Sequence, residues 1–271
     1  MHRRRDAGIV RSGSRSGSDD TIDRYGAAAG PLALLVHGAV VNRATMAPLA
    51  EALAPRMQVV VPDLPGHGSR RAERFTFEAA LRDLEALVAA AGDVPVVVAG
   101  DSLGGYLALA LAARCGERIA GIVAGGCTFP MSGAAAAGSA LTDMPVAALA
   151  RLAGAAAVES ALLRGFVMLG GDPAVATDTA AAGLRLAARG ESIAELRRFP
   201  LRETIERIRC PITFVNGARD VPIVWFDRYY AGCAQRGRAV RVARTPHGVM
   251  VLRPCSVAHE IEAFVWDLVS E

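Results

Sequence analysis

The feature that most constrains this chain is a β-branched run that passes, through one serine, directly into a helix-forming stretch. Valines at residues 96–98 lead into Gly-Asp-Ser-Leu-Gly with Ser102 at its centre, and an apolar helical pattern follows over residues 103–115. A strand that reverses sharply into a helix forces its central residue toward strained backbone angles, and Gly100 and Gly104 remove the side chains that would collide there. The pattern predicts a tight elbow with an exposed serine hydroxyl. The pentapeptide without its flanks also occurs in ordinary turns.

Short apolar segments alternate with helical patterns on both sides of this elbow. Near-continuous Val, Ile and Leu runs are typical of strands covered on both faces, so we expect an α/β fold with a mostly parallel sheet flanked by helices. The expected strands are residues 32–36, 58–61, 94–99, 119–124, 212–216 and 239–243. The expected helices are residues 46–54, 77–91, 103–115, 225–235 and 257–269.

Length and patterning together predict one α/β domain with an insertion. The chain has 271 residues, which suits a single large core. Residues 1–28 are polar and rich in Gly, Ser and Arg, and we expect a disordered tail there. The core is expected over residues 29–125 and 210–271, and an Ala-rich helical lid over residues 126–209.

The large apolar residues of this insertion are expected mainly to pack the lid onto the core, with a minority lining a pocket. They are Met131, Leu141, Leu152, Phe166, Met168 and Leu169.

Composition excludes several functional classes. A hydrophobic fraction of 52% against 21% charged residues describes a globular chain. The formal net charge is only +3, and the arginines of the first 24 residues contribute most of it, so no clustered basic face for nucleic acid is expected. Five widely spaced cysteines without a C-x-x-C pair favour buried free thiols over disulfides or a metal site.

The sequence predicts neither an export signal nor a membrane span. The arginines at residues 3–5 are followed by Gly, Ser and Asp rather than by the apolar region of a signal peptide. The longest uncharged stretch, residues 119–142, contains Pro130 and begins as a strand. We therefore expect a cytoplasmic protein with a small-molecule substrate as its partner and no contact with membrane, and the oligomeric state stays open.

A serine hydroxyl is a poor nucleophile at neutral pH, so it needs a base and an acid that orients the base. Asp220 follows the strand expected at residues 212–216, and His247 follows the strand expected at residues 239–243. Both side chains should emerge at the carboxyl edge of the sheet, together with Ser102, where open α/β sheets bind ligands. Ser102, Asp220 and His247 are therefore the candidate catalytic residues.

Asp220 and His247 each have an alternative interpretation without a catalytic role. Asp220 could cap the helix that follows Pro222, and His247 could be an ordinary loop residue. Three other histidines fit the role of base less well, because His2 lies in the tail, His67 in a glycine-rich turn and His259 in the last helix. Among the other acids, Asp63 and Asp101 are expected to be structural, with the Asp101 side chain pointing away from the reaction.

Charge that develops on a carbonyl oxygen must meet preorganised N–H donors. The first residue of the helix after the elbow, Leu103, supplies one backbone donor. The second is expected from the loop after residues 32–36, at Ala39, with Val40 as the alternative. His37 is expected to hold this loop by hydrogen bonding rather than to transfer protons.

Five segments, in this order, make the chain resemble the α/β-hydrolase superfamily. They are H-G at residues 37–38, P-D-L-P-G-H-G at 62–68, G-D-S-L-G-G at 100–105, N-G-A-R-D at 216–220 and P-H-G at 246–248. The resemblance covers residue 30 to the C-terminus and is to the small lidded branch of esterases, thioester hydrolases, C–C hydrolases and cofactor-free haloperoxidases. It supports Ala39 as an oxyanion donor. One departure is that residues 21–25 are too short and polar to supply the two usual N-terminal strands.

The resemblance and the residues together predict a serine hydrolase that cleaves an ester or thioester of a small to medium apolar substrate through an acyl-enzyme. Trp225, Val249 and Met250 are expected to bound the substrate pocket. No metal or organic cofactor is implied. A C–C hydrolase, lyase or perhydrolase with the same triad remains an alternative, as does a non-catalytic ligand-binding member of the superfamily.

Overall fold

Runs of aliphatic residues form the sheet because their side chains can be buried on both faces of it. The computed structural model describes residues 20–26, 30–131, 148 and 151–269. Its strands are β1 (Ile22–Tyr25), β2 (Leu32–Val36), β3 (Gln58–Pro62), β4 (Val96–Asp101), β5 (Ile119–Gly125), β6 (Ile212–Gly217) and β7 (Gly237–Val242). They form one sheet in the order β1-β3-β2-β4-β5-β6-β7. The expected α/β class with a mostly parallel sheet is confirmed.

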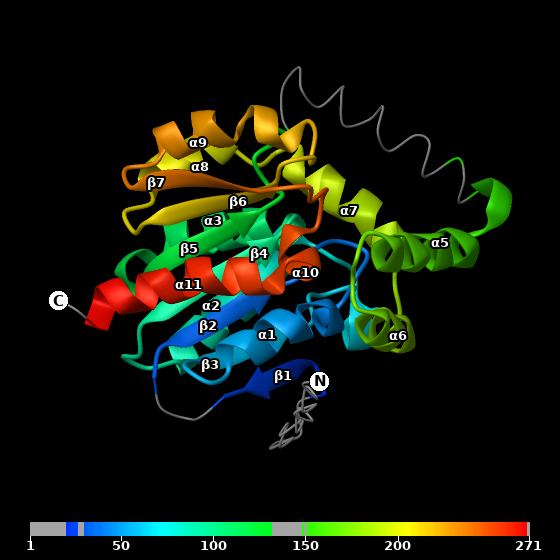
Figure 1. The fold of residues 1–271 in the computed structure, drawn as a ribbon, viewed down its shortest axis with the longest axis horizontal. Coiled ribbons are helices and arrows are strands. Elements are labelled where there is room, and N and C mark those ends of the chain that lie inside the picture. The colour runs from blue at the N-terminus through cyan, green and yellow to red at the C-terminus, as the bar shows by residue number, and fades with distance from the viewer. Residues whose placement is uncertain (1–19, 27–29, 132–147, 149–150, 270–271) are drawn as a thin grey trace, which may run out of the picture.

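Helices cover both faces of this sheet (Figure 1). The α-helices are α1 (Ala47–Leu53), α2 (Phe77–Ala90), α3 (Leu103–Cys115), α5 (Ala155–Met168), α6 (Pro173–Ala182), α7 (Ala187–Leu196), α8 (Leu201–Arg207), α9 (Asp227–Cys233), α10 (Val249–Leu252) and α11 (Pro254–Val269). Short 3-10 helices are η1 (Arg43–Met46), η2 (Gly68–Arg70), η3 (Gly116–Arg118) and η4 (Ile223–Trp225).

Two apolar clusters, one on each face, hold the layers together. On one face, the buried side chains of α2, α3 and α8 pack against alternate residues of the strands, with Phe214 of β6 fully buried among them. On the other face, residues of α1, α10 and α11 pack against the remaining strand residues, among them Leu35 and Val123. Because successive side chains of a strand point to opposite faces, each strand contributes to both clusters.

The parallel strands place their carboxyl ends at one edge. Val36 of β2 pairs with Gly100 of β4, and Asp101 pairs with Gly125 of β5. Strands β5, β6 and β7 continue the same parallel arrangement. The turns after β2, β4, β5, β6 and β7 therefore meet at this edge. Open α/β sheets bind their ligands at the carboxyl ends of the strands.

The sheet edge differs from the sequence expectation. Residues 1–28 were expected to form a disordered tail, but Ile22–Tyr25 forms β1, which pairs antiparallel with β3. The polar residue Asp23 is tolerated there because its carboxylate lies 3.1 Å from Nε of Arg43. Residues 1–19 and 27–29 lie outside the described residues.

Between β5 and β6 the chain forms helices, and α5, α6 and α7 lie together beyond one end of the sheet (Figure 1). Three large apolar residues of this insertion are exposed rather than packed: Leu152 and Met168 are each 87% exposed, and Leu169 is 51% exposed. Met131 packs against the core as expected. Leu141 falls outside the described residues. Helix α8 also differs from a lid element, because its Leu201 and Ile205 are part of the core.

Candidate active site

The elbow around Ser102 forms as the glycines predict. Ser102 has φ 54° and ψ −113°, a region that L-residues rarely adopt. A Cβ on Gly100 would lie 2.1 Å from the carbonyl oxygen of Gly104, and a Cβ on Gly104 would lie 2.1 Å from that of Val36. Any larger residue at either position would collide with backbone. The serine therefore stands at the sharp junction of β4 and α3.

The loops after β6 and β7 bring an acid and a base together. Asp220 Oδ2 lies 2.8 Å from Nδ1 of His247. The Asp220 side chain is buried, whereas about half of the imidazole, 49%, is exposed. An Nδ1–H that donates to the carboxylate leaves Nε2 free to accept a proton on the other side of the ring.

Ser102 and His247 each lie against one of two adjacent glycines at the end of β5. The backbone N–H of Ser102 donates to the carbonyl of Gly125 at 2.7 Å. A Cβ on the next residue, Gly126, would lie 2.8 Å from Cε1 of His247. The strained serine and the imidazole thus occupy one corner at the carboxyl edge of the sheet. Their roles in catalysis stay a prediction.

The electrostatics of this corner favour protonation of His247. Desolvation lowers the pKa of His247, but the hydrogen bond and charge of Asp220, together with the charge of Asp101, outweigh it and raise the pKa above its ordinary value. The charge of Arg189 on α7 acts in the opposite direction. The helical insertion therefore reaches close enough to influence the imidazole.

The loop after β2, residues 37–42, passes beside the serine, and we call it the oxyanion loop. A Cβ on Gly38 would lie 3.5 Å from Cβ of Ser102. His37 is fully buried; its Nδ1 lies 2.8 Å from the carbonyl of Gly38, and its Nε2 accepts from the backbone N–H of Leu64 at 3.1 Å. His37 therefore holds the loop by hydrogen bonding, as predicted.

This arrangement also orients the expected oxyanion donor. Because a trans peptide points its C=O and N–H in opposite directions, fixing the carbonyl of Gly38 fixes the N–H of Ala39 on the far side of the peptide. Leu103 begins α3, and the N–H of a first helical residue has no partner within its helix. Ala39 and Leu103 stay predictions as oxyanion donors, and the alternative donor, Val40, has its own strained φ of 73°.

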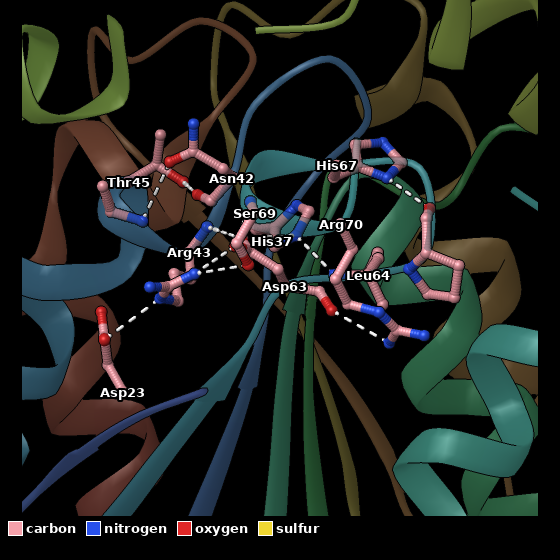
Figure 2. A network of polar contacts seen from close by, with 12 residues as sticks. Asp23, His37, Asn42, Arg43, Thr45, Asp63, Leu64, His67, Ser69 and Arg70 are labelled. Carbon is pink, nitrogen blue, oxygen red and sulfur yellow. Dashed lines mark hydrogen bonds and ion pairs between the residues drawn. The ribbon is translucent and has the colours of Figure 1, made fainter. Parts of the chain in front are cut away.

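A buried polar network supports the oxyanion loop from below (Figure 2). Burial lowers the pKa of His37, so the ring is neutral and can accept from Leu64. The carboxylate of Asp63 accepts from the backbone N–H groups of Arg43 and Ser69, each at 2.9 Å, and also pairs with the Arg43 guanidinium. Asp63 is thus structural, as predicted.

Asp101 is closer to the reaction than the sequence suggested. It is 5% exposed, and its Oδ1 has no hydrogen-bond partner among the described residues. Burial raises the pKa of Asp101 to about 6, although a hydrogen bond from the backbone N–H of Met250 and the charge of His247 oppose this. The Asp101 carboxyl therefore interacts electrostatically with His247, and it also belongs to the turn that precedes Ser102.

Two asparagines were missed by sequence reasoning. Asn216 Oδ1 accepts from the N–H of Gly126 at 2.9 Å and so fixes the residue beside His247. Asn42 closes the oxyanion loop with three hydrogen bonds through its amide. The local signal for Asn216 was its place in N-G-A-R-D next to Asp220, whereas no local signal marks the distant partners of Asn42.

The structure decides between the alternatives for Asp220 and for the expected pocket residues. Pro222, not Asp220, is the N-terminal cap of η4, so the capping alternative for the Asp220 side chain does not hold. Val249 and Met250 are each 1% exposed and belong to the core, while Trp225 is 70% exposed. The expectation that all three bound one pocket is therefore wrong for the first two. His2 lies outside the described residues.

Other classes of site are not found in the described part of the chain. Among those residues no group of three or more His, Cys, Asp and Glu could hold a metal ion. The five cysteines are all free, but only Cys127 is buried. No helix within the described ranges is both long and apolar enough to cross a membrane.

Comparisons with known proteins place this geometry in context. Residues 33–260 match the model of the Alpha/beta hydrolase family. The chain is 38% identical over 103 residues to Lipase LipV of Mycobacterium tuberculosis, covering 38% of this chain and 39% of the lipase. It is 44% identical over 84 residues to the pimeloyl-[acyl-carrier protein] methyl ester esterase of Xanthomonas campestris, covering 31% of this chain and 32% of the esterase. The matches thus span about two fifths or less of these relatives.

The fold is also that of solved hydrolase structures. The enol-lactonase from Burkholderia xenovorans superimposes with a TM-score of 0.72 at 21% identity, covering 90% of this chain and 95% of the lactonase. An identity this low supports the fold alone.

Proposed function

Because this chain belongs to the alpha/beta hydrolase family, we propose that it is a serine hydrolase that cleaves an ester or thioester through a covalent acyl-enzyme. The observation that carries the proposal is the hydrogen bond of 2.8 Å between His247 Nδ1 and Asp220 at the corner where strained Ser102 stands. A serine of this kind needs a base that is itself oriented by an acid.

The proposed reaction has two steps. Oγ of Ser102 attacks the carbonyl carbon while Nε2 of His247 takes the hydroxyl proton, and the negative carbonyl oxygen is held by the N–H groups of Ala39 and Leu103. The C–O or C–S bond then breaks, and His247 returns the proton to the leaving alcohol or thiol. Water, deprotonated by His247, hydrolyses the acyl-serine. Asp220 stabilises the imidazolium in both steps.

The proposed substrate carries an apolar acyl or alkyl group of small to medium size, and two relatives are named as a lipase and as a methyl ester esterase. The charge of Arg189 on α7 acts on the imidazole, about half of which is exposed. A bound apolar group would exclude water from this corner and so strengthen the interaction of the N–H donors with the developing charge.

The same triad could instead serve a C–C hydrolase, a lyase or a perhydrolase, since family membership does not choose among them. A panel of p-nitrophenyl esters and acyl thioesters of graded chain length tests the proposal directly. We expect turnover of short to medium chains, and a loss of kcat of about 10⁴ to 10⁶ in Ser102→Ala and in His247→Ala with the fold intact. Full turnover by a folded Ser102→Ala variant would refute the assignment. Covalent labelling of Ser102 by a fluorophosphonate, without turnover of any simple ester, would favour the alternative reactions.

A further inference from the structure

We propose that Asn42 is a positioning residue through which the helical insertion holds the oxyanion loop in its reactive geometry. The inference rests on the proposed serine hydrolase function and deepens it, because it assigns a role to a side chain outside the triad. It is carried by the contacts of Asn42, by the strained backbone of Val40 and by the segment of chain that both of them meet.

Asn42 is fully buried, and Figure 2 shows its side chain next to Thr45. Its Nδ2 donates to the carbonyl of Thr179 at 2.9 Å and to that of Gly183 at 3.0 Å, both at the C-terminal end of α6. Its Oδ1 accepts from the N–H of Ala44 at 3.1 Å, which caps η1. One amide thus satisfies the end of a helix in the insertion and the start of the helix that follows the oxyanion loop.

Val40 adds a second link to the same segment. Its φ of 73° is a genuine outlier for a β-branched residue, and such a conformation persists only where the surroundings hold it. The carbonyl of Val40 accepts from the backbone N–H of Arg185 at 3.0 Å. Residues 179–185 therefore hold the oxyanion loop at both Val40 and Asn42.

Along the chain, the links at Val40 and Asn42 follow Ala39, whereas His37 precedes it. His37 fixes the carbonyl of Gly38, and the insertion fixes the carbonyl of Val40. The N–H of Ala39 is therefore set between one anchor in the core and one in the insertion. Small displacements of a preorganised donor are costly, because a misplacement of about 1 Å can lower a rate by about 100-fold.

The test compares Asn42→Asp and Asn42→Ser with Thr45→Val. Asn42→Asp keeps the shape and the acceptor for Ala44 but loses the amide donors. Asn42→Ser also keeps an acceptor that can cap η1, without adding charge. Thr45→Val is the matched control on the same turn: the Thr45 hydroxyl donates to the carbonyl of Asn42 at 2.8 Å, and its loss leaves both links to the insertion in place.

Four quantities are measured for each variant: the melting temperature, kcat and KM on the best p-nitrophenyl ester, and the affinity for a trifluoromethyl ketone that carries the same acyl chain. The ketone reports on the oxyanion donors because it binds the serine as a tetrahedral adduct that resembles the transition state. Both Asn42 variants should lose about 10- to 100-fold in kcat with KM changed by less than about 3-fold, and should lose ketone affinity in parallel. Thr45→Val should stay within about 3-fold of the wild type in each kinetic quantity.

Asn42 variants that match Thr45→Val in kcat and ketone affinity would overturn the inference. So would a loss that appears in KM and melting temperature but not in ketone affinity, because that is the signature of a residue with a structural role only. The proposed function is read separately, from the wild type: an active wild type with unaffected Asn42 variants rejects the positioning role alone, whereas a wild type without esterase activity and without ketone binding rejects both.

Discussion

Asp220 and His247, 27 positions apart in the chain, share a hydrogen bond of 2.8 Å between Oδ2 and Nδ1. The pair exists because β6 and β7 are parallel neighbours, so that the turns after both strands open at one edge. The carboxylate is buried and engages Nδ1, which leaves Nε2 of the partly exposed ring free to accept a proton. The chemical consequences of this pair can be measured.

Replacing Asp220 with asparagine should lower activity and move its pH dependence. A base must be neutral to take a proton, so wild-type kcat/KM falls as the pH drops through the pKa of His247, which Asp220 helps to raise. In Asp220→Asn we expect kcat to fall by about 10⁴-fold and the acidic limb to shift to lower pH. A pH–rate profile between pH 5 and 9 tests this, and an acidic limb that stays in place would separate Asp220 from His247.

His37 should be needed for rate rather than for substrate binding. His37→Leu removes the donor to Gly38 and the acceptor for Leu64, and we expect kcat to fall by about 100-fold with a smaller change in KM. His37→Asn offers a donor near the position of Nδ1, so it should keep more of the activity. Steady-state kinetics on folded protein decide the matter, and equal losses in both variants would contradict a role through the Gly38 carbonyl.

Asp101→Asn should stabilise the protein and lower the pKa of His247. A buried carboxyl with a pKa of about 6 favours folding when protonated, and this advantage is lost as the pH rises through that value. The isosteric amide removes the buried charge, so the free energy of unfolding at pH 7.5 should rise by about 1 to 3 kcal/mol. The acidic limb of kcat/KM should move to lower pH with kcat at its plateau reduced by less than about 10-fold. Urea unfolding and a pH–rate profile measure the two effects, and a less stable variant would disprove the first.

His67 should make the protein sensitive to acid. Burial lowers the pKa of His67 to about 3, with the charge of Arg185 acting in the same direction. Unfolded His67 titrates near its ordinary value, so the unfolded state binds the extra proton and stability falls as the pH drops below about 6.5. In His67→Gln the slope of unfolding free energy between pH 6 and 4 should flatten by about 1.4 kcal/mol per pH unit. An unchanged slope would mean that His67 does not stay neutral in the folded protein.

Local patterns were enough to predict the core of the fold and the position of the candidate triad. The elbow at Ser102 depends on its immediate neighbours, and the placement of Asp220 and His247 depends only on which strands they follow. Both kinds of information are short-range, because a residue at the end of a parallel strand has little freedom in where it emerges.

Features that depend on distant partners could not be predicted. Strand β1 was missed because Asp23 makes a short segment look like tail; its pairing with the distant strand β3 and the ion pair of Asp23 with Arg43 hold it in the sheet. The role of Asn42 depends on carbonyls 137 and 141 positions away. The exposure of Leu152 and Met168 likewise reflects the packing of the insertion as a whole rather than the apolar character of either residue.

The central claim is that one serine is activated by one imidazole, and covalent labelling tests it most directly. The wild-type protein is treated with a fluorophosphonate, and the adduct is counted by intact mass and located by peptide mapping. We predict one adduct per chain, on Ser102, absent in Ser102→Ala and formed at least about 10³-fold more slowly in His247→Ala. No adduct, an adduct on another residue, or a labelling rate that His247→Ala leaves unchanged would contradict the account.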